Sequence, residues 1–213
     1  MKGFIQTLKN IWSLKELRDK ILYTISLVLV YRWASYISLP AINMTEVGNV
    51  LEHFQNQGGS QQGSNLLGLL SSFTGGAFSR ASIMAIGIMP YISASIIVQL
   101  MGMAIPYLQK LQKDGESGRK TLNQITRWLA VGVCLFQAPT YLTTLTQVFL
   151  PYEDFRQAYH VAPESIMFWL PSIFILTAGS IFAMWLGEKI TDKGIGNGIS
   201  ILIMVGILAD LPV

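Results

Sequence analysis

Five long runs of apolar residues, each separated from the next by a polar stretch, dominate the pattern of this chain. The runs cover residues 21–39, 83–105, 128–150, 166–186 and 199–213. A helix needs about 20 predominantly apolar residues to cross a hydrocarbon core about 30 Å thick. The first four runs reach this length, and the fifth reaches it if residues before Ile199 join the helix. The pattern therefore predicts an all-α, polytopic membrane protein with five transmembrane helices.

The residues before the first run have a different pattern. In residues 1–20, apolar side chains recur at helical spacing with lysines and polar residues between them: Phe4, Ile5, Leu8, Ile11 and Trp12. Such a pattern is typical of an amphipathic helix that lies on a membrane surface, and a disordered tail is the alternative. We therefore divide the chain into this N-terminal helix, 1–20, and a membrane-embedded unit, 21–213.

A shorter apolar segment precedes the second run. Residues 66–73 are too few to span a membrane, and two glycines at 75–76 separate this segment from the second run. Such a segment can fold back into the protein, because irregular backbone at membrane depth is tolerated when protein or a cavity surrounds it. We expect a re-entrant stopper over about 66–82, with a short helix resting on the outer surface as the alternative.

The basic residues lie mostly in alternate connections. Twelve of the 15 lysines and arginines lie before the first run, between the second and third, or between the fourth and fifth. Only Arg80 and Arg156 lie in the other two connections, and Arg32 lies inside the first run. Because lysine and arginine are retained on the cytoplasmic side, this distribution predicts a cytoplasmic N-terminus.

The sequence contains no recognisable catalytic constellation. His53 and His160 lie in predicted external loops without the spacing of metal ligands, and Cys134 is the single cysteine. Only Arg32 and Asp210 are ionisable within the runs, whereas ion-coupled transporters usually need buried carboxylates or histidines along the path. We predict no enzymatic activity, no metal and no cofactor.

Three motifs give a specific resemblance. They are Gly75-Gly-Ala-Phe-Ser-Arg-Ala-Ser-Ile83 with Gly87-Ile-Met-Pro-Tyr-Ile-Ser-Ala-Ser95, Gly115-Glu-Ser-Gly-Arg119, and Met184-Trp-Leu-Gly-Glu-Lys-Ile-Thr-Asp-Lys-Gly-Ile-Gly-Asn-Gly-Ile-Ser-Ile-Leu-Ile203. In this order they resemble the SecY family, the channel subunits of the bacterial protein translocon. The resemblance implies ten helices in two inverted halves, of which we expect residues 21–213 to be the N-terminal half.

The resemblance also implies site residues. Four positions of an aliphatic pore ring correspond to Ile88 and Ile92 in the second run and to Ile199 and Ile203 in the fifth. Members of each pair are four residues apart and share a helix face. The lateral gate, where signal sequences reach lipid, corresponds to Ser93 and Gln99. The stopper corresponds to a plug whose residues are Leu66, Leu67, Leu69, Leu70, Phe73, Gly75 and Gly76.

The implied function is secretion and membrane insertion of unfolded polypeptides across the bacterial inner membrane. The implied partners are the SecE and SecG subunits, the SecA motor or a ribosome, the signal sequences of preproteins, membrane lipid and the C-terminal half of the channel. Two alternatives remain open: half of a secondary transporter of small solutes, and a membrane assembly factor that transports nothing.

Overall fold

The computed structural model describes residues 14–43, 74, 76–77, 80–149, 162 and 165–209. Within this part of the chain there are six helices and no strand, apart from one isolated bridge between Ser38 and Ser82. The helices are α2 (Lys15–Ala34), α5 (Met89–Ala104), α6 (Pro106–Lys113), α7 (Gly115–Phe149), α8 (Ile166–Lys193) and α9 (Gly198–Ala209). The prediction of an all-α protein is confirmed.

Two of these helices, α7 and α8, are long and apolar enough to cross a membrane. A third crossing results if α5 and α6 are counted as one span, although they meet at a bend of 103°. The helix α9 is apolar but shorter. These helices are those of a membrane protein, and the count of five crossings remains a prediction.

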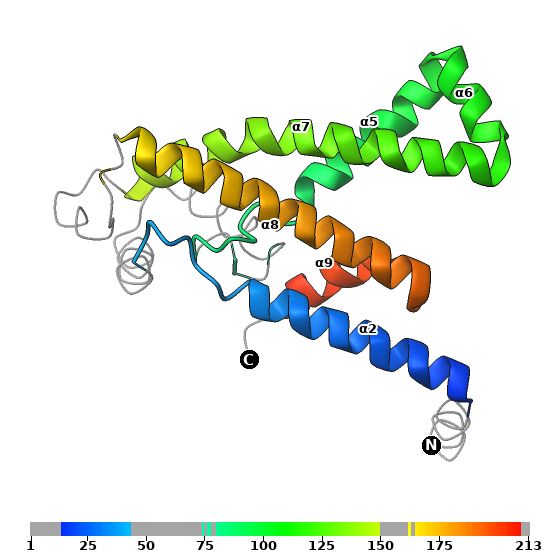
Figure 1. Ribbon diagram of the computed structural model, residues 1–213, viewed down its shortest axis with the longest axis horizontal. Coiled ribbons are helices and arrows are strands. Elements are labelled where there is room, and N and C mark those ends of the chain that lie inside the picture. Colours follow the sequence, from blue (N-terminus) through cyan, green and yellow to red (C-terminus); the bar gives the residue numbers. More distant parts are fainter. Residues whose placement is uncertain are drawn as a thin grey trace.

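The helix α8 lies at the centre of the described structure and contacts α2, α7 and α9 (Figure 1). The helix α5 packs on α7, and α7 also contacts the short helix α6 (Figure 1). Small residues along α8 allow this close packing. Gly179, Ser180, Ala183 and Gly187 are all buried on it.

The first predicted span, 21–39, differs from the helix that forms. Residues 15–20 belong to α2 rather than to a separate surface helix, and α2 ends at Ala34. Beyond it, the Leu39 N–H donates to the Ala81 carbonyl at 3.0 Å, and the Ile83 N–H donates to the Ile37 carbonyl at 2.9 Å. The chain leaves the helix because its backbone pairs with a distant segment. Residues 1–13 lie outside the described part.

The helix α5 begins six residues later than the start of the second apolar run. Gly87 has a φ of +59°, a left-handed conformation that ends any helix entering it. Pro90 lies in the first turn of α5, where its missing N–H has no partner to lose. Although Pro90 lies within the second apolar run, it therefore marks the start of a helix and does not interrupt one.

The helix α7 extends far beyond the third apolar run, 128–150, at its N-terminal end. It begins at Gly115 and continues for 35 residues. The polar stretch 114–120 is therefore mostly helical, and the turn between α6 and α7 is confined to Asp114 and the start of α7. Polar residues at the first turns are exposed to water, so they need no apolar face to remain helical.

Candidate functional site

The four ring candidates lie at the beginnings of two helices. Ile88 is the N-cap residue of α5, and Ile92 follows one turn later, with its N–H donating to the Ile88 carbonyl at 3.1 Å. Ile199 lies in the first turn of α9, and Ile203 one turn beyond. The sequence separates these helix starts by more than a hundred residues, and the structure brings them together through α8.

Both helix starts contribute to one apolar cluster. Ile88 is only 5% exposed within it, beside Met84 and Leu202. Ile92 and Ile199 are partly buried and pack against the same cluster. Ile203 is partly buried on α9 but is not among the residues of this cluster. The structure therefore brings together three of the four ring candidates.

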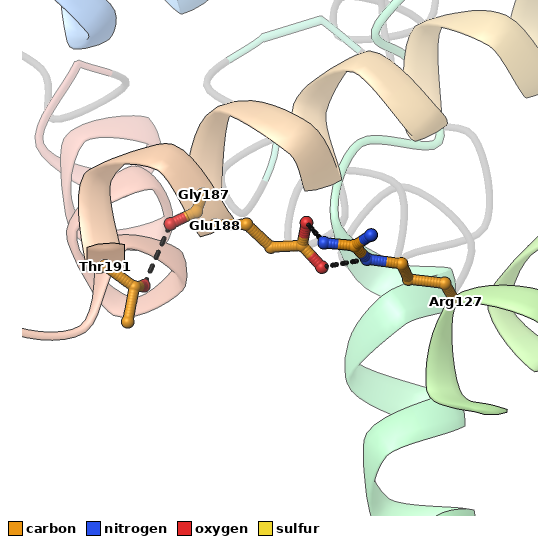
Figure 2. A network of polar contacts seen from close by, with 4 residues as sticks. All are labelled: Arg127, Gly187, Glu188 and Thr191. Carbon is orange, nitrogen blue, oxygen red and sulfur yellow. Dashed lines mark hydrogen bonds and ion pairs between the residues drawn. The ribbon is translucent and has the colours of Figure 1, made fainter. Parts of the chain in front are cut away.

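The start of α9 is fixed by two side chains. The Asn197 Oδ1 accepts the Ile199 N–H at 3.1 Å, which is the usual role of an asparagine N-cap. The Thr191 Oγ1 accepts the Gly198 N–H at 2.9 Å. The same hydroxyl donates to the Gly187 carbonyl at 2.9 Å (Figure 2). Two N–H groups that would otherwise lack partners at the helix start are thereby satisfied.

A bidentate ion pair holds α7 to α8. The Arg127 Nε donates to Glu188 Oε1 at 2.7 Å, and the Arg127 Nη2 pairs with Glu188 Oε2 (Figure 2). Glu188 adjoins Gly187, the acceptor for Thr191. Close by, Tyr91 of α5 packs against Ala130 and Met184 of the two paired helices. One turn of α8, residues 187–191, therefore contacts α7 on one side and α9 on the other.

Two glycines of α8 let other segments approach closely. A Cβ at Gly179 would lie 2.2 Å from the carbonyl oxygen of Ile83, in the segment that leads into α5. A Cβ at Gly187 would lie 3.0 Å from Cγ1 of Ile199. The segment that leads into α5 and the start of α9 therefore both lie against glycines of the same helix.

An aromatic ring joins the end of α2 to the segment before α5. The guanidinium carbon of Arg80 lies 4.8 Å from the centre of the Tyr36 ring, and that of Arg32 lies 5.7 Å from it. These are cation–π contacts. A Cβ at Gly76, whose φ is +77°, would meet the Arg80 side chain. The Tyr36 ring thus gives a contact to Arg32, the charged residue within the first apolar run.

The other predicted site residues divide into two groups. Of the plug candidates only Gly76 is described, and the rest lie outside the described residues. The lateral-gate candidates are both on α5, where Ser93 is partly buried and Gln99 is exposed. The Gln99 Nε2 donates to the Ser95 Oγ at 3.3 Å. Ser93 and Gln99 are six residues apart and therefore point to different sides of the helix.

The polar groups of the described residues form no metal site, since no cluster of three His, Cys, Asp or Glu side chains occurs among them. Sequence reasoning missed Arg127, Thr191 and Glu188. The ion pair joins residues 61 positions apart, and no local pattern indicates such a contact. Thr191 and Glu188 lie within the quoted 184–203 motif, but the motif alone assigns them no partner.

Comparison with known proteins places these features in a family. A family model described as SecY matches residues 82–213. The chain is 41% identical over 200 residues to the protein translocase subunit SecY of Escherichia coli, covering 94% of this chain and 42% of the relative. It is 39% identical over 209 residues to that of Staphylococcus aureus, covering 98% and 45% respectively.

A third relative, the protein translocase subunit SecY of Buchnera aphidicola subsp. Schizaphis graminum, is 40% identical over 197 residues, covering 92% of this chain and 42% of the relative. The chain thus spans less than half the length of these three relatives. The matched residues include both helix starts, the α8 turn and all four ring candidates. The chain belongs to the SecY family.

Proposed function

We propose that this chain forms one half of a protein-conducting channel, through which unfolded polypeptides cross or enter the bacterial cytoplasmic membrane. One observation carries the proposal: the starts of α5 and α9 meet at one apolar cluster that includes Ile88, Ile92 and Ile199. Aliphatic side chains offer no hydrogen bonds to a sliding polypeptide. An apolar constriction also excludes water and ions by dewetting. Ile203 completes the contribution of this half to the ring.

Membership of the SecY family supports the other parts of the proposal, namely the crossings, the orientation, the plug and the lateral gate. Five helices cross the membrane, the N-terminus lies in the cytoplasm, and residues 66–82 form the plug. The left-handed Gly76 and the irregular, buried segment 81–88 support a non-helical connection between the plug and α5. Ser93 and Gln99 of α5 contribute to the lateral gate that this helix forms with the C-terminal half.

The relatives are named as translocase subunits, which supports a set of partners. We infer that the channel works with SecE and SecG, and that the SecA motor or a ribosome drives the polypeptide. Signal sequences and membrane lipid meet at the lateral gate. The chain itself supplies a path and no chemical step, so we assign it no enzymatic activity.

A crosslinking experiment tests this function. A photo-reactive amino acid at position 92 of the full-length protein should crosslink to a preprotein halted during translocation. The matched control is position 96, one turn further along α5, where Ile96 is 51% exposed and lies outside the apolar cluster. Crosslinks at 92 but not at 96 support the channel, and their absence at 92 contradicts it.

The alternatives predict different effects of Ile92→Asn. A channel should leak ions and accept preproteins with defective signal sequences, because a polar ring no longer excludes water. A small-solute transporter should lose affinity for its solute instead. A non-transporting assembly factor should change in neither respect.

A further inference from the structure

Thr191 has two hydrogen-bonding roles that the pore function above does not use. Its Oγ1 donates to the Gly187 carbonyl within α8 and accepts the N–H of Gly198, the first residue of α9, both at 2.9 Å. A threonine hydroxyl has one donor and can accept as well, so both roles are compatible. The hydroxyl links the last turns of one helix to the first residue of the next.

The turn that carries Thr191 is itself fixed. Glu188, three residues earlier, forms the bidentate pair with Arg127 of α7 (Figure 2). The backbones of α8 and α9 also touch closely, since a Cβ at Gly198 would lie 2.1 Å from the Gly187 carbonyl oxygen. Because the two backbones are this close, a shift of the α9 start would also move Ile199, whose side chain packs against Gly187.

We propose that Thr191 is a positioning residue of the pore: its hydroxyl sets where α9 starts and so where Ile199 stands in the constriction. The inference rests on the proposed channel function. Glycine residues at 194, 196 and 198 give the connection few steric restraints of its own. The connection is restrained instead by hydrogen bonds: the Ile195 N–H donates to the Thr24 Oγ1 at 3.3 Å, and Thr191 and Asn197 accept the N–H groups at the start of α9.

Two substitutions test the hydroxyl. Thr191→Val keeps the branched shape and removes both hydrogen bonds, whereas Thr191→Ser keeps the hydroxyl. Thr191→Ala is a second hydroxyl-deleting variant in case the valine variant does not accumulate. The matched control is Thr140→Val on α7, where the hydroxyl bonds only the Phe136 carbonyl of its own helix. The measurement is ion leak through the resting full-length channel in liposomes with its partner subunits.

We expect the leak of Thr191→Val to rise several-fold, while Thr191→Ser and Thr140→Val stay close to the parent. If Thr191 had only a structural role, the hydroxyl-deleting variants would accumulate less and melt at a lower temperature. Thr191→Ser would then not return the leak to the level of the parent. A parent-like leak in both hydroxyl-deleting variants would overturn the inference. A leak of Thr191→Ser as large as that of Thr191→Val would also overturn the inference.

A further variant separates this inference from the function on which it rests. Ile199→Asn places a polar group directly in the ring. If Ile199→Asn leaks and the hydroxyl-deleting variants do not, only the role of Thr191 fails. If Ile199→Asn does not leak, the assignment of the ring fails, and the positioning role fails with it.

Discussion

Two glycines within long helices of this protein have opposite surroundings. A Cβ at Gly179 of α8 would lie 2.2 Å from the Ile83 carbonyl oxygen, 2.8 Å from its side chain and 3.0 Å from its carbonyl carbon. A Cβ at Gly132 of α7 would meet nothing within 4 Å. The same substitution should therefore have different effects at the two positions, because only the first glycine is in contact with another segment.

We predict that Gly179→Ala lowers the free energy of unfolding by about 1–3 kcal/mol, since backbone atoms must move to admit the methyl group. Gly132→Ala is the matched control. It should be neutral or stabilising by up to about 1 kcal/mol, as alanine is the better helix former. Thermal unfolding in detergent measures both. Equal effects of the two substitutions would contradict the close approach of the Ile83 segment.

At the scale of helices, the pairing of α7 with α8 depends on a charge contact at one end of an apolar seam. Ala130 and Met184 pack beside Arg127 and Glu188, with Tyr91 of α5 against them. The Arg127 side chain is 49% exposed and that of Glu188 is 16% exposed. A partly exposed pair of this kind contributes modestly, and salt should weaken it.

We predict a coupling free energy of about 1 kcal/mol between Arg127 and Glu188. A double-mutant cycle with Arg127→Ala and Glu188→Ala measures it by thermal unfolding. The charge-swapped variant, Arg127→Glu with Glu188→Arg, should recover part of the loss that either reversal alone causes. Additive effects of the two alanine substitutions would show that the pair does not connect the helices.

The apolar pattern predicted the helices better than it predicted their ends. It identified α7, α8 and α9, because a long apolar run has few alternatives in a membrane. It placed the start of α5 too early, since residues 81–88 are apolar and buried without being helical. It also missed the break between Ala104 and Pro106, where Ile105 is extended. Gly87 and the backbone pairing of residues 81–83 with residues 37–39 together set the start of α5, and no local pattern encodes that pairing.

The site followed a similar division. Motif resemblance predicted Ile88, Ile92, Ile199 and Ile203 as ring residues. The structure brings the first three to one cluster, and their role in a pore stays a prediction. The resemblance said nothing of Thr191 or of the Arg127–Glu188 pair, because those residues act through partners on other helices. Their spacing along the chain carries no periodic signal, so only the packing of α7, α8 and α9 reveals them.

At the scale of the whole molecule, the ends of α8 provide a test of orientation. The helix has 28 residues and is therefore about 42 Å long, which is enough to place its ends on opposite sides of a membrane. Exposed Ala162 precedes its first residue, and exposed Lys193 is its last. The distribution of basic residues predicts that the Lys193 end faces the cytoplasm.

We predict that a cysteine at Ala162 reacts with a membrane-impermeant maleimide applied to the outside of the inner membrane. A cysteine at Lys193 should react only after the membrane is permeabilised. Both substitutions are made in a Cys134→Ser background, which removes the single thiol of these 213 residues. The reverse pattern of labelling would contradict the predicted orientation.

The two glycine contacts of α8 have a consequence for how this protein tolerates changes of length. Gly179 receives the segment that starts α5, and Gly187 receives the start of α9. Their separation along α8 is about 12 Å, with about 80° of rotation between them. The number of residues between them thus sets the relative depth and angle of the segment that leads into α5 and of the start of α9. Inserting one residue there would turn one contact by about 100° relative to the other and separate the isoleucines. Many substitutions between Gly179 and Gly187 should therefore be tolerated, whereas an insertion or deletion of even one residue there should not.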